Sequence, residues 1–163
     1  MRAYLFFLYV YLQEVIIIMK PKETVDFHIR WSWHNISRMY NLKASDFGGT
    51  MAIGYTLLNI DKDGTPSTKL GPKMGMEPRS LTRMIKSLED NGLIERKSDS
   101  KDKRLVNLFL TKKGEDLRKK AREYVIHFNQ TIYDNIDEKD IKTCFDVLKK
   151  INNLIDQNNI FKN

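Results

Sequence analysis

The segment from Pro66 to Thr111 constrains the fold more than any other part of this 163-residue chain. It reads in order as a short helix, a turn, a second helix with one basic and one apolar face, and a hairpin with a charged tip. This order is the plan of a winged helix-turn-helix, whose second helix enters the major groove of DNA. The sequence therefore predicts a mainly α fold with a small β-hairpin wing (α+β), and a protein that binds double-stranded DNA.

The second helix of this segment separates its charged and apolar side chains onto two faces. Arg79, Arg83 and Lys86, called the basic row, are four and three residues apart, which stacks them on one side of a helix with about 3.6 residues per turn. The opposite side carries Leu81, Met84, Ile85 and Leu88. Pro78 suits a first helical turn, and Gly92 is typical of a left-handed stop. One face can pack while the other meets a polyanion, although ordinary surface helices also have a charged side.

The segments on either side of this helix complete the pattern. Upstream, we expect Ser67 and Thr68 to cap a short first helix through their hydroxyl groups. Downstream, residues 93–96 and 105–110 read as two short strands, and the polar, cation-rich residues 97–104 lie between them. A hairpin tip of this composition suits a wing that lies along phosphates or enters a minor groove.

From Ser80 onward the residues resemble the MarR family of bacterial transcriptional regulators. The resemblance is strong over about residues 66–118 and extends, by helix pattern, from Met19 to the end of the chain. Its most specific parts are Leu-Glu-x-x-Gly-Leu-Ile-x-Arg at residues 88–96 and Asp-x-Arg at residues 102–104. The resemblance implies a winged helix-turn-helix with N- and C-terminal dimerisation helices, which binds a pseudo-palindromic DNA operator as a homodimer.

The resemblance also implies roles for the hairpin tip. Arg104 is expected to reach the minor groove, and Asp102 is expected to help hold the wing. Lys103 departs from the family pattern, in which many members have a second arginine, because lysine keeps the charge but lacks the planar guanidinium. Pro72 is a second departure and is expected to shorten the first helix. The residues predicted to serve DNA binding are Ser67, Thr68, Arg79, Ser80, Thr82, Arg83, Lys86, Lys101, Asp102, Lys103 and Arg104.

Positive charge is concentrated on the same part of the chain. The whole sequence has 28 Lys and Arg residues against 21 Asp and Glu residues, a net charge of +7. Residues 62–122 hold 17 of the basic and 9 of the acidic residues, or +8, and the rest, with 11 basic and 12 acidic residues, carries −1. Such clustering is typical of a nucleic-acid surface, whereas charge that serves solubility is spread over the protein.

Both flanks of the winged lobe are predicted to be helical and apolar. We expect one domain over residues 19–163, with the lobe at residues 46–111 and dimerisation helices at residues 19–45 and 112–163. Thr111 is expected to cap a long helix that runs to about Asn135, and Asp137 is expected to cap the last helix. The last helix carries an apolar stripe of Ile141, Phe145, Leu148, Ile151 and Ile155. Because half-sites read by two-fold dimers lie about 34 Å apart, a homodimer is expected. The alternative is a monomer with a large helical appendage.

Residues 46–61 are predicted to form the helix that joins the dimerisation region to the lobe. Three glycines make it a poor helix by propensity, and close packing against a neighbour is the expected reason. The resemblance implies that a small aromatic or anionic effector binds where this helix meets the dimerisation helices. Trp31, His34, Met51 and Tyr55 would line that pocket. The alternative is that these are ordinary core side chains and that His34 is structural.

A long apolar run opens the chain and does not fit the rest. Residues 1–18 have the hydrophobicity of a signal peptide or membrane anchor, but Gln13 and Glu14 interrupt the run and no small-residue cleavage site follows. We expect this apolar extension to lie upstream of a true start at Met19, because codons CAG GAG GTN at residues 13–15 would contain a ribosome-binding sequence. The alternative is a translated segment that is buried in the dimer or attaches the protein to a membrane.

The sequence carries no enzyme signature. His28, His34, His127 and Cys144 lack metal-ligand spacing, and neither a Gly-rich phosphate loop nor a nucleophile elbow is present. We therefore expect no catalytic residue, metal or cofactor. One cysteine fits a reducing cytosol. Cys144 is expected to be a small core residue, and oxidant sensing is the alternative.

These observations predict a cytoplasmic, homodimeric, sequence-specific regulator of transcription. Repression is the default expectation, because an occupied promoter excludes polymerase. A small aromatic or anionic effector is expected to modulate the DNA affinity, and no membrane partner is expected. The alternatives are a winged-helix module that binds protein and a regulator that residues 1–18 attach to a membrane.

Overall fold

The computed structural model describes residues 20–98 and 106–157 of the chain. Contacts between residues divide it into two compact units, residues 1–42 and residues 43–163. The predictions for the apolar extension and for Lys101, Asp102, Lys103 and Arg104 lie outside the described residues. Within the described part of the chain, no helix is both long and apolar enough to cross a membrane.

The first unit is helical where it is described. A short 3-10 helix, η1 (Pro21–Glu23), precedes α2 (Val25–Ser45), whose last residues belong to the second unit. The rings of Phe27 and Trp31 are stacked with their centroids 6.2 Å apart. Trp31 and Trp33 are exposed, and no residue of α2 is buried. This helix therefore presents apolar surface in the single chain.

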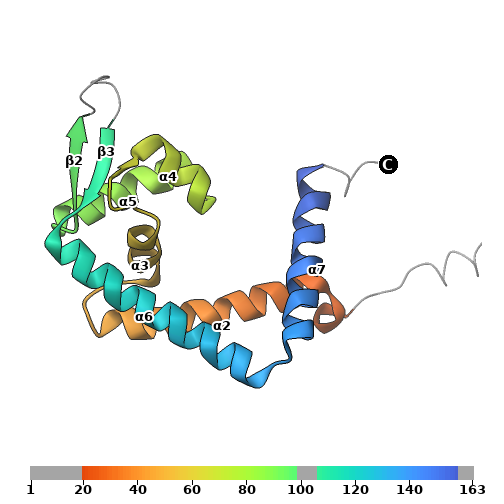
Figure 1. Ribbon diagram of the computed structural model, residues 1–163. Coiled ribbons are helices and arrows are strands. Elements are labelled where there is room, and N and C mark those ends of the chain that lie inside the picture. Colours follow the sequence, from red (N-terminus) through yellow and green to blue (C-terminus); the bar gives the residue numbers. More distant parts are fainter. Residues whose placement is uncertain (1–19, 99–105, 158–163) are drawn as a thin grey trace, which may run out of the picture. The chain divides into compact units, whose positions relative to one another are not determined.

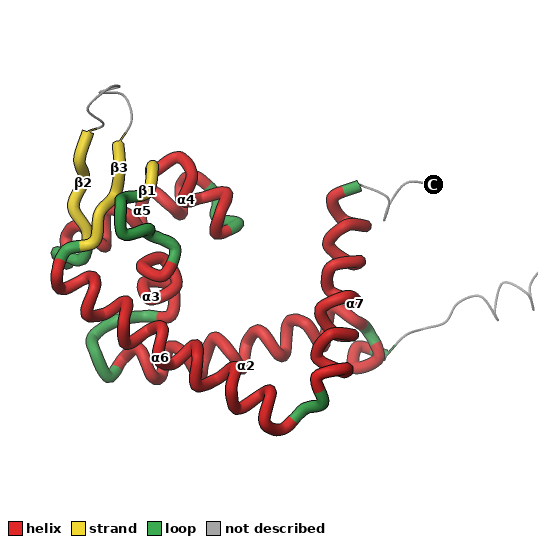
Figure 2. The backbone as a smooth tube through the Cα atoms, viewed as in Figure 1, coloured by secondary structure: helices red, strands yellow, loops and turns green. Residues whose placement is uncertain are grey.

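The second unit holds the winged lobe and two longer helices (Figures 1 and 2). Its helices are α3 (Met51–Leu58), α4 (Ser67–Met74), α5 (Pro78–Asp90), α6 (Lys112–Asn135) and α7 (Glu138–Asp156). Its strands are β1 (Thr65–Pro66), β2 (Ile94–Ser98) and β3 (Val106–Leu110). They form an antiparallel sheet in the order β1-β3-β2, so β3 is the middle strand.

A single apolar cluster holds the lobe together. It consists of Leu57, Ile60, Leu70, Leu81, Ile85, Leu88, Leu93, Ile94 and Leu108. These side chains come from α3, α4, α5, β2, β3 and the turns between them, so every layer of the lobe contributes to one core. Burial of each such side chain stabilises the fold by about 1.5 to 3 kcal/mol. The core therefore fixes which face of α5 turns inward.

The helix predicted over residues 46–61 is shorter than expected. Thr50 caps α3, since its hydroxyl oxygen accepts a hydrogen bond from the backbone N–H of Ile53 at 3.2 Å. Gly48 lies before the helix with φ at 66°, a left-handed conformation that ends α2 and its turn. Gly54 is inside α3, and a Cβ there would lie 3.3 Å from the Cβ of Ala121 on α6. Close packing is therefore the reason for the glycine at 54.

The predicted cap of the first helix of the lobe is also wrong. Pro66 occupies the capping position of α4, and no side chain makes a capping hydrogen bond. Ser67 is the first residue of the helix instead, because the preceding residues are drawn into strand β1 against β3. Pro72 lies inside α4, which is only 8 residues long, in line with the predicted shortening.

The start of α6 agrees with its prediction. Thr111 caps this helix, and its hydroxyl oxygen accepts a hydrogen bond from the N–H of Gly114 at 3.1 Å. Asp137 caps α7 by position, without a side-chain hydrogen bond. Strand β1 was not predicted. It pairs with β3 through Thr65 opposite Leu108 and completes the sheet.

Candidate nucleic-acid interface

Helix α5 is buried on one face and open on the other. Leu81, Ile85 and Leu88 are buried, with exposed fractions of 8%, 5% and 0%. The basic row on the opposite face is exposed along its whole length. The proline at the first helical position and the glycine after the end, with φ at 65°, bound the helix as predicted. The amphipathic pattern of the sequence is therefore confirmed, whereas contact of the basic row with DNA stays a prediction.

The basic row differs in its electrostatic surroundings from Lys73 and Arg96, two other cations of the lobe. Lys73 pairs with Asp61 at 3.4 Å, and Arg96 pairs with Glu89 at 2.9 Å. Neither Arg79, Arg83 nor Lys86 forms an ion pair with another described residue. Their charge is left uncompensated at the surface, which is the arrangement that attracts phosphate groups.

Short polar side chains lie beside the basic row. Ser80 and Thr82 are exposed on α5. The hydroxyl of Thr82 donates a hydrogen bond to the carbonyl of Pro78 at 2.9 Å, which leaves its oxygen free to accept another. Hydroxyl groups at such positions can bond to phosphates or to base edges.

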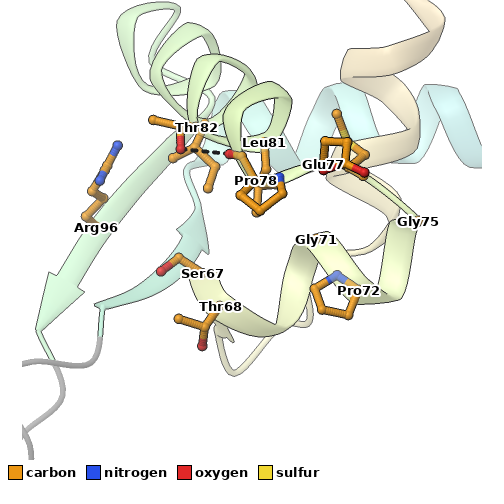
Figure 3. Close-up of a pocket in the computed structure, with 12 residues that line it drawn as sticks. Ser67, Thr68, Gly71, Pro72, Gly75, Glu77, Pro78, Leu81, Thr82 and Arg96 are labelled. Atoms are coloured by element: carbon orange, nitrogen blue, oxygen red, sulfur yellow. Dashed lines mark hydrogen bonds between the residues drawn. The ribbon is translucent and has the colours of Figure 1, made fainter.

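A groove of about 630 Å³ separates α4 from α5 (Figure 3). Ser67 and Thr68, at the start of α4, lie across it from Thr82 of α5, and Arg96 of β2 lines it as well. The structure thus brings three of the predicted residues together around one opening. The remaining described ones, Ser80 and the basic row, do not line it.

Arg96 was not among the residues predicted to serve DNA binding. Its guanidinium Nε donates to Oε2 of Glu89, so it ties strand β2 to the end of α5. The signal was present in the sequence, since Glu89 and Arg96 are the two charged residues that the motif at residues 88–96 specifies. A motif shows that residues recur together, but it does not show that they touch.

Strand β2 carries a second cation that is held in place. The ammonium of Lys97 lies 4.9 Å from the centre of the Phe109 ring on β3 and 2.6 Å from a carboxylate oxygen of Glu95. A cation over an aromatic face is attracted by the ring. This contact fixes the base of the hairpin, and the predicted contacts of its tip lie in residues that the structure does not describe.

The predicted effector pocket draws on both units. Trp31 and His34 lie on α2 in the first unit, with ring centroids 6.1 Å apart, and both are exposed. Met51 is half-buried and Tyr55 is exposed on α3 in the second unit. The pocket stays a prediction. Among residues 20–98 and 106–157, no cluster of His, Cys, Asp or Glu could hold a metal ion.

Helix α7 exposes most of the apolar stripe that was predicted for it. Ile141 is buried, whereas Phe145, Leu148 and Ile155 are exposed by 57%, 39% and 52%. Cys144 is exposed too, so the expectation of a core cysteine is wrong. Most of the stripe of α7 is therefore open to solvent or to a partner.

Three comparisons identify similar proteins. Residues 58–106 match the sequence model of the MarR family. The HTH-type transcriptional regulator BilQ of Clostridium symbiosum is 28% identical over 105 residues, which is 64% of this chain and 73% of that protein. Among solved structures, the MepR–DNA complex of S. aureus has a TM-score of 0.74 at 21% identity and matches 81% of this chain and 98% of that one. A MarR mutant from E. coli, complexed with operator DNA, has a TM-score of 0.67 at 25% identity, with 76% and 89% matched.

Proposed function

We propose that this chain is a sequence-specific regulator of transcription of the MarR family, which binds double-stranded DNA as a homodimer. One observation carries the proposal: the three cations of the basic row are exposed and unpaired among the described residues, on a helix whose other face is locked into the core. Such a helix can offer its cations to a groove without losing its own packing.

The roles that we propose for the described residues rest on where they lie. The basic row, with Ser80 and Thr82, reads base edges in the major groove. Ser67 and Thr68 bind phosphates from the start of α4, where free backbone N–H groups add to the attraction. At the hairpin tip, Arg104 meets the flanking minor groove and Asp102 holds the wing, as in the family pattern, and Lys101 and Lys103 add positive charge that attracts phosphates.

The apolar surface of the longer helices supports the homodimer. Monomeric proteins seldom leave large contiguous apolar patches exposed. In this chain exposed apolar side chains recur along α2 and α7, including Trp31, Trp33, Phe145 and Ile155. We propose that residues 19–163 form one domain, in which residues 19–45 and 112–163 dimerise and residues 46–111 bind DNA.

The remaining parts of the proposal concern regulation. Promoter occupancy makes repression the expected outcome, and the protein acts in the cytoplasm without catalysing a reaction. A small aromatic or anionic effector modulates the DNA affinity from a pocket that includes Trp31, His34, Met51 and Tyr55. Comparing how aromatic acids and uncharged aromatic compounds change the DNA affinity would tell whether the pocket recognises the aromatic ring or the negative charge of the ligand.

A binding titration tests the proposal. The affinity of the protein for the duplex upstream of its own gene and for a shuffled duplex of the same composition is measured by fluorescence anisotropy at two salt concentrations. We expect the upstream duplex to bind at least about 1,000-fold more tightly than the shuffled one. Equal affinity for both duplexes at both salt concentrations would refute sequence-specific recognition, and a monomer in sedimentation equilibrium would refute the homodimer.

A further inference from the structure

The end of α5 is held by the start of α6, although the two segments lie about twenty residues apart in the sequence. The hydroxyl of Thr111 donates a hydrogen bond to the carbonyl of Gly92 at 2.7 Å. The backbone N–H of Thr111 donates to the carbonyl of Leu93 at 3.1 Å. The ammonium of Lys113 donates to the carbonyl of Asn91 at 2.9 Å. These residues are called the joint.

The hydroxyl of Thr111 serves both helices at once. Its hydrogen goes to Gly92, just past the end of α5, while its oxygen accepts the N–H of Gly114 in the first turn of α6. A capping residue of this kind usually contributes about 0.5 to 2 kcal/mol to the helix that it caps. In this protein the same hydroxyl also donates to the carbonyl of Gly92, so the end of α5 and the start of α6 share one hydrogen-bonding group.

Charge explains why Lys113 belongs to the joint. The last turn of α5 contains Glu89 and Asp90 and no basic residue, although the C-terminal end of a helix carries partial negative charge. The missing cations come from other elements. Lys113 reaches the carbonyl of Asn91 from α6, and Arg96 reaches Glu89 from β2. The end of α5 is therefore stabilised by side chains that also fix its position.

The backbones at the joint lie close together. A Cβ added at Gly114 would run into the carbonyl group of Leu93. Gly114 is buried, and both of its neighbours in this contact are backbone atoms, which cannot turn aside as a flexible side chain can. The approach of α6 to the end of α5 is thus limited by sterics as well as by hydrogen bonds.

We propose that Thr111 and Lys113 are positioning residues for DNA recognition, which set the tilt of α5 by holding its C-terminal turn against α6. The inference rests on the proposed function. The apolar core fixes which face of α5 points outward, and the joint fixes the angle at which its axis leaves the lobe. Base contacts require the basic row to be aligned with the groove, whereas attraction to phosphates does not. Loosening the joint therefore lowers discrimination between sequences more than it lowers binding to DNA in general.

Lys113→Met tests the proposal, because methionine keeps much of the aliphatic stem and removes the donor. Lys112→Met is the matched control, since Lys112 is the neighbouring exposed cation and, among the described residues, pairs only with Glu115 and Asp116 of its own helix. Each variant loses one positive charge at the same end of α6. The upstream and shuffled duplexes are titrated at several salt concentrations, and thermal unfolding is followed in parallel.

We expect Lys113→Met to reduce the ratio of specific to shuffled affinity by roughly three- to tenfold, which is less than the full value of a hydrogen bond to a charged group because the apolar core still holds α5. The salt dependence on shuffled DNA should match that of Lys112→Met, and Lys113→Arg should restore the ratio. Equal ratios for Lys113→Met and Lys112→Met would overturn the proposal. If the wild-type protein itself does not discriminate, the proposed function has failed instead.

Thr111 provides a second, independent variant. Thr111→Ser keeps the hydroxyl and should leave the ratio unchanged. Thr111→Val removes both hydrogen bonds of the hydroxyl, keeps the backbone bond to Leu93, and should lower the ratio. Hydrogen exchange at the amide of Thr111, which donates to the carbonyl of Leu93, reports on the joint directly, even where the melting temperature falls. Faster exchange with an unchanged ratio would overturn the proposal, because the joint would then open without affecting recognition.

Discussion

Truncating the apolar stripe of α7 should weaken the proposed dimer by a calculable amount. Phe145 is 57% exposed in the single chain. Complete burial of a phenylalanine side chain is worth about 1.5 to 3 kcal/mol, so covering the exposed part contributes about 1 to 1.5 kcal/mol in each protomer. In a two-fold dimer the residue is covered twice. Phe145→Ala should therefore cost about 2 to 3 kcal/mol and raise the dimer dissociation constant by roughly 30- to 150-fold.

Sedimentation equilibrium over a wide concentration range measures this constant. Val147→Ala is a suitable control, because Val147 is also exposed on α7 but lies away from the stripe. The control should dissociate with nearly the wild-type constant, and both variants should keep the helix content of the wild type by circular dichroism. The reasoning is refuted if Phe145→Ala changes the constant by less than about threefold, or if Val147→Ala changes it as much.

Three further predictions concern the lobe. Arg83→Ala should lose about 1 to 3 kcal/mol of binding free energy on the upstream duplex and little on the shuffled one. Lys101→Ala should lower the slope of log affinity against log salt concentration by about 1 on both duplexes. Anisotropy titrations that show equal losses on both duplexes for both variants would contradict these roles. Leu88→Ala should lower the free energy of unfolding by about 2 to 5 kcal/mol in urea titrations, because the side chain is fully buried, and a loss below about 1 kcal/mol would be inconsistent with its place in the core. Gly54→Val should lower the melting temperature by forcing α3 away from Ala121, and an unchanged melting temperature would show that the contact yields easily.

The features that the sequence predicted well are those determined by local pattern. The faces of α5 follow from the spacing of its cations and leucines, and its bounds follow from Pro78 and Gly92. Thr111 could be recognised as a cap because the capping bond spans only three residues, to Gly114. In each case the physical cause lies within one or two helical turns, so the sequence contains it directly.

The features that were missed depend on contacts between distant segments. Strand β1 is only two residues long and exists because Thr65 and Pro66 pair with β3, more than forty residues later. That pairing displaced the expected cap at Ser67. The helix expected over residues 46–61 begins only at Met51, because Gly48 ahead of it is left-handed. The sequence does not show which of its several glycines adopts that conformation. The groove position of Arg96 and the bond from Lys113 to Asn91 likewise appear only when the chain has folded.

The central place of β3 in the sheet has a consequence for how the hairpin could vary. This strand is held in register from both sides, by Thr65 and Pro66 of β1 and by five residues of β2. It then leads through Thr111 directly into α6. An insertion or a grafted sequence between residues 98 and 106 would therefore leave strand β3 in its place. This stretch is thus suited to engineering new operator preferences without changing the fold that holds α5.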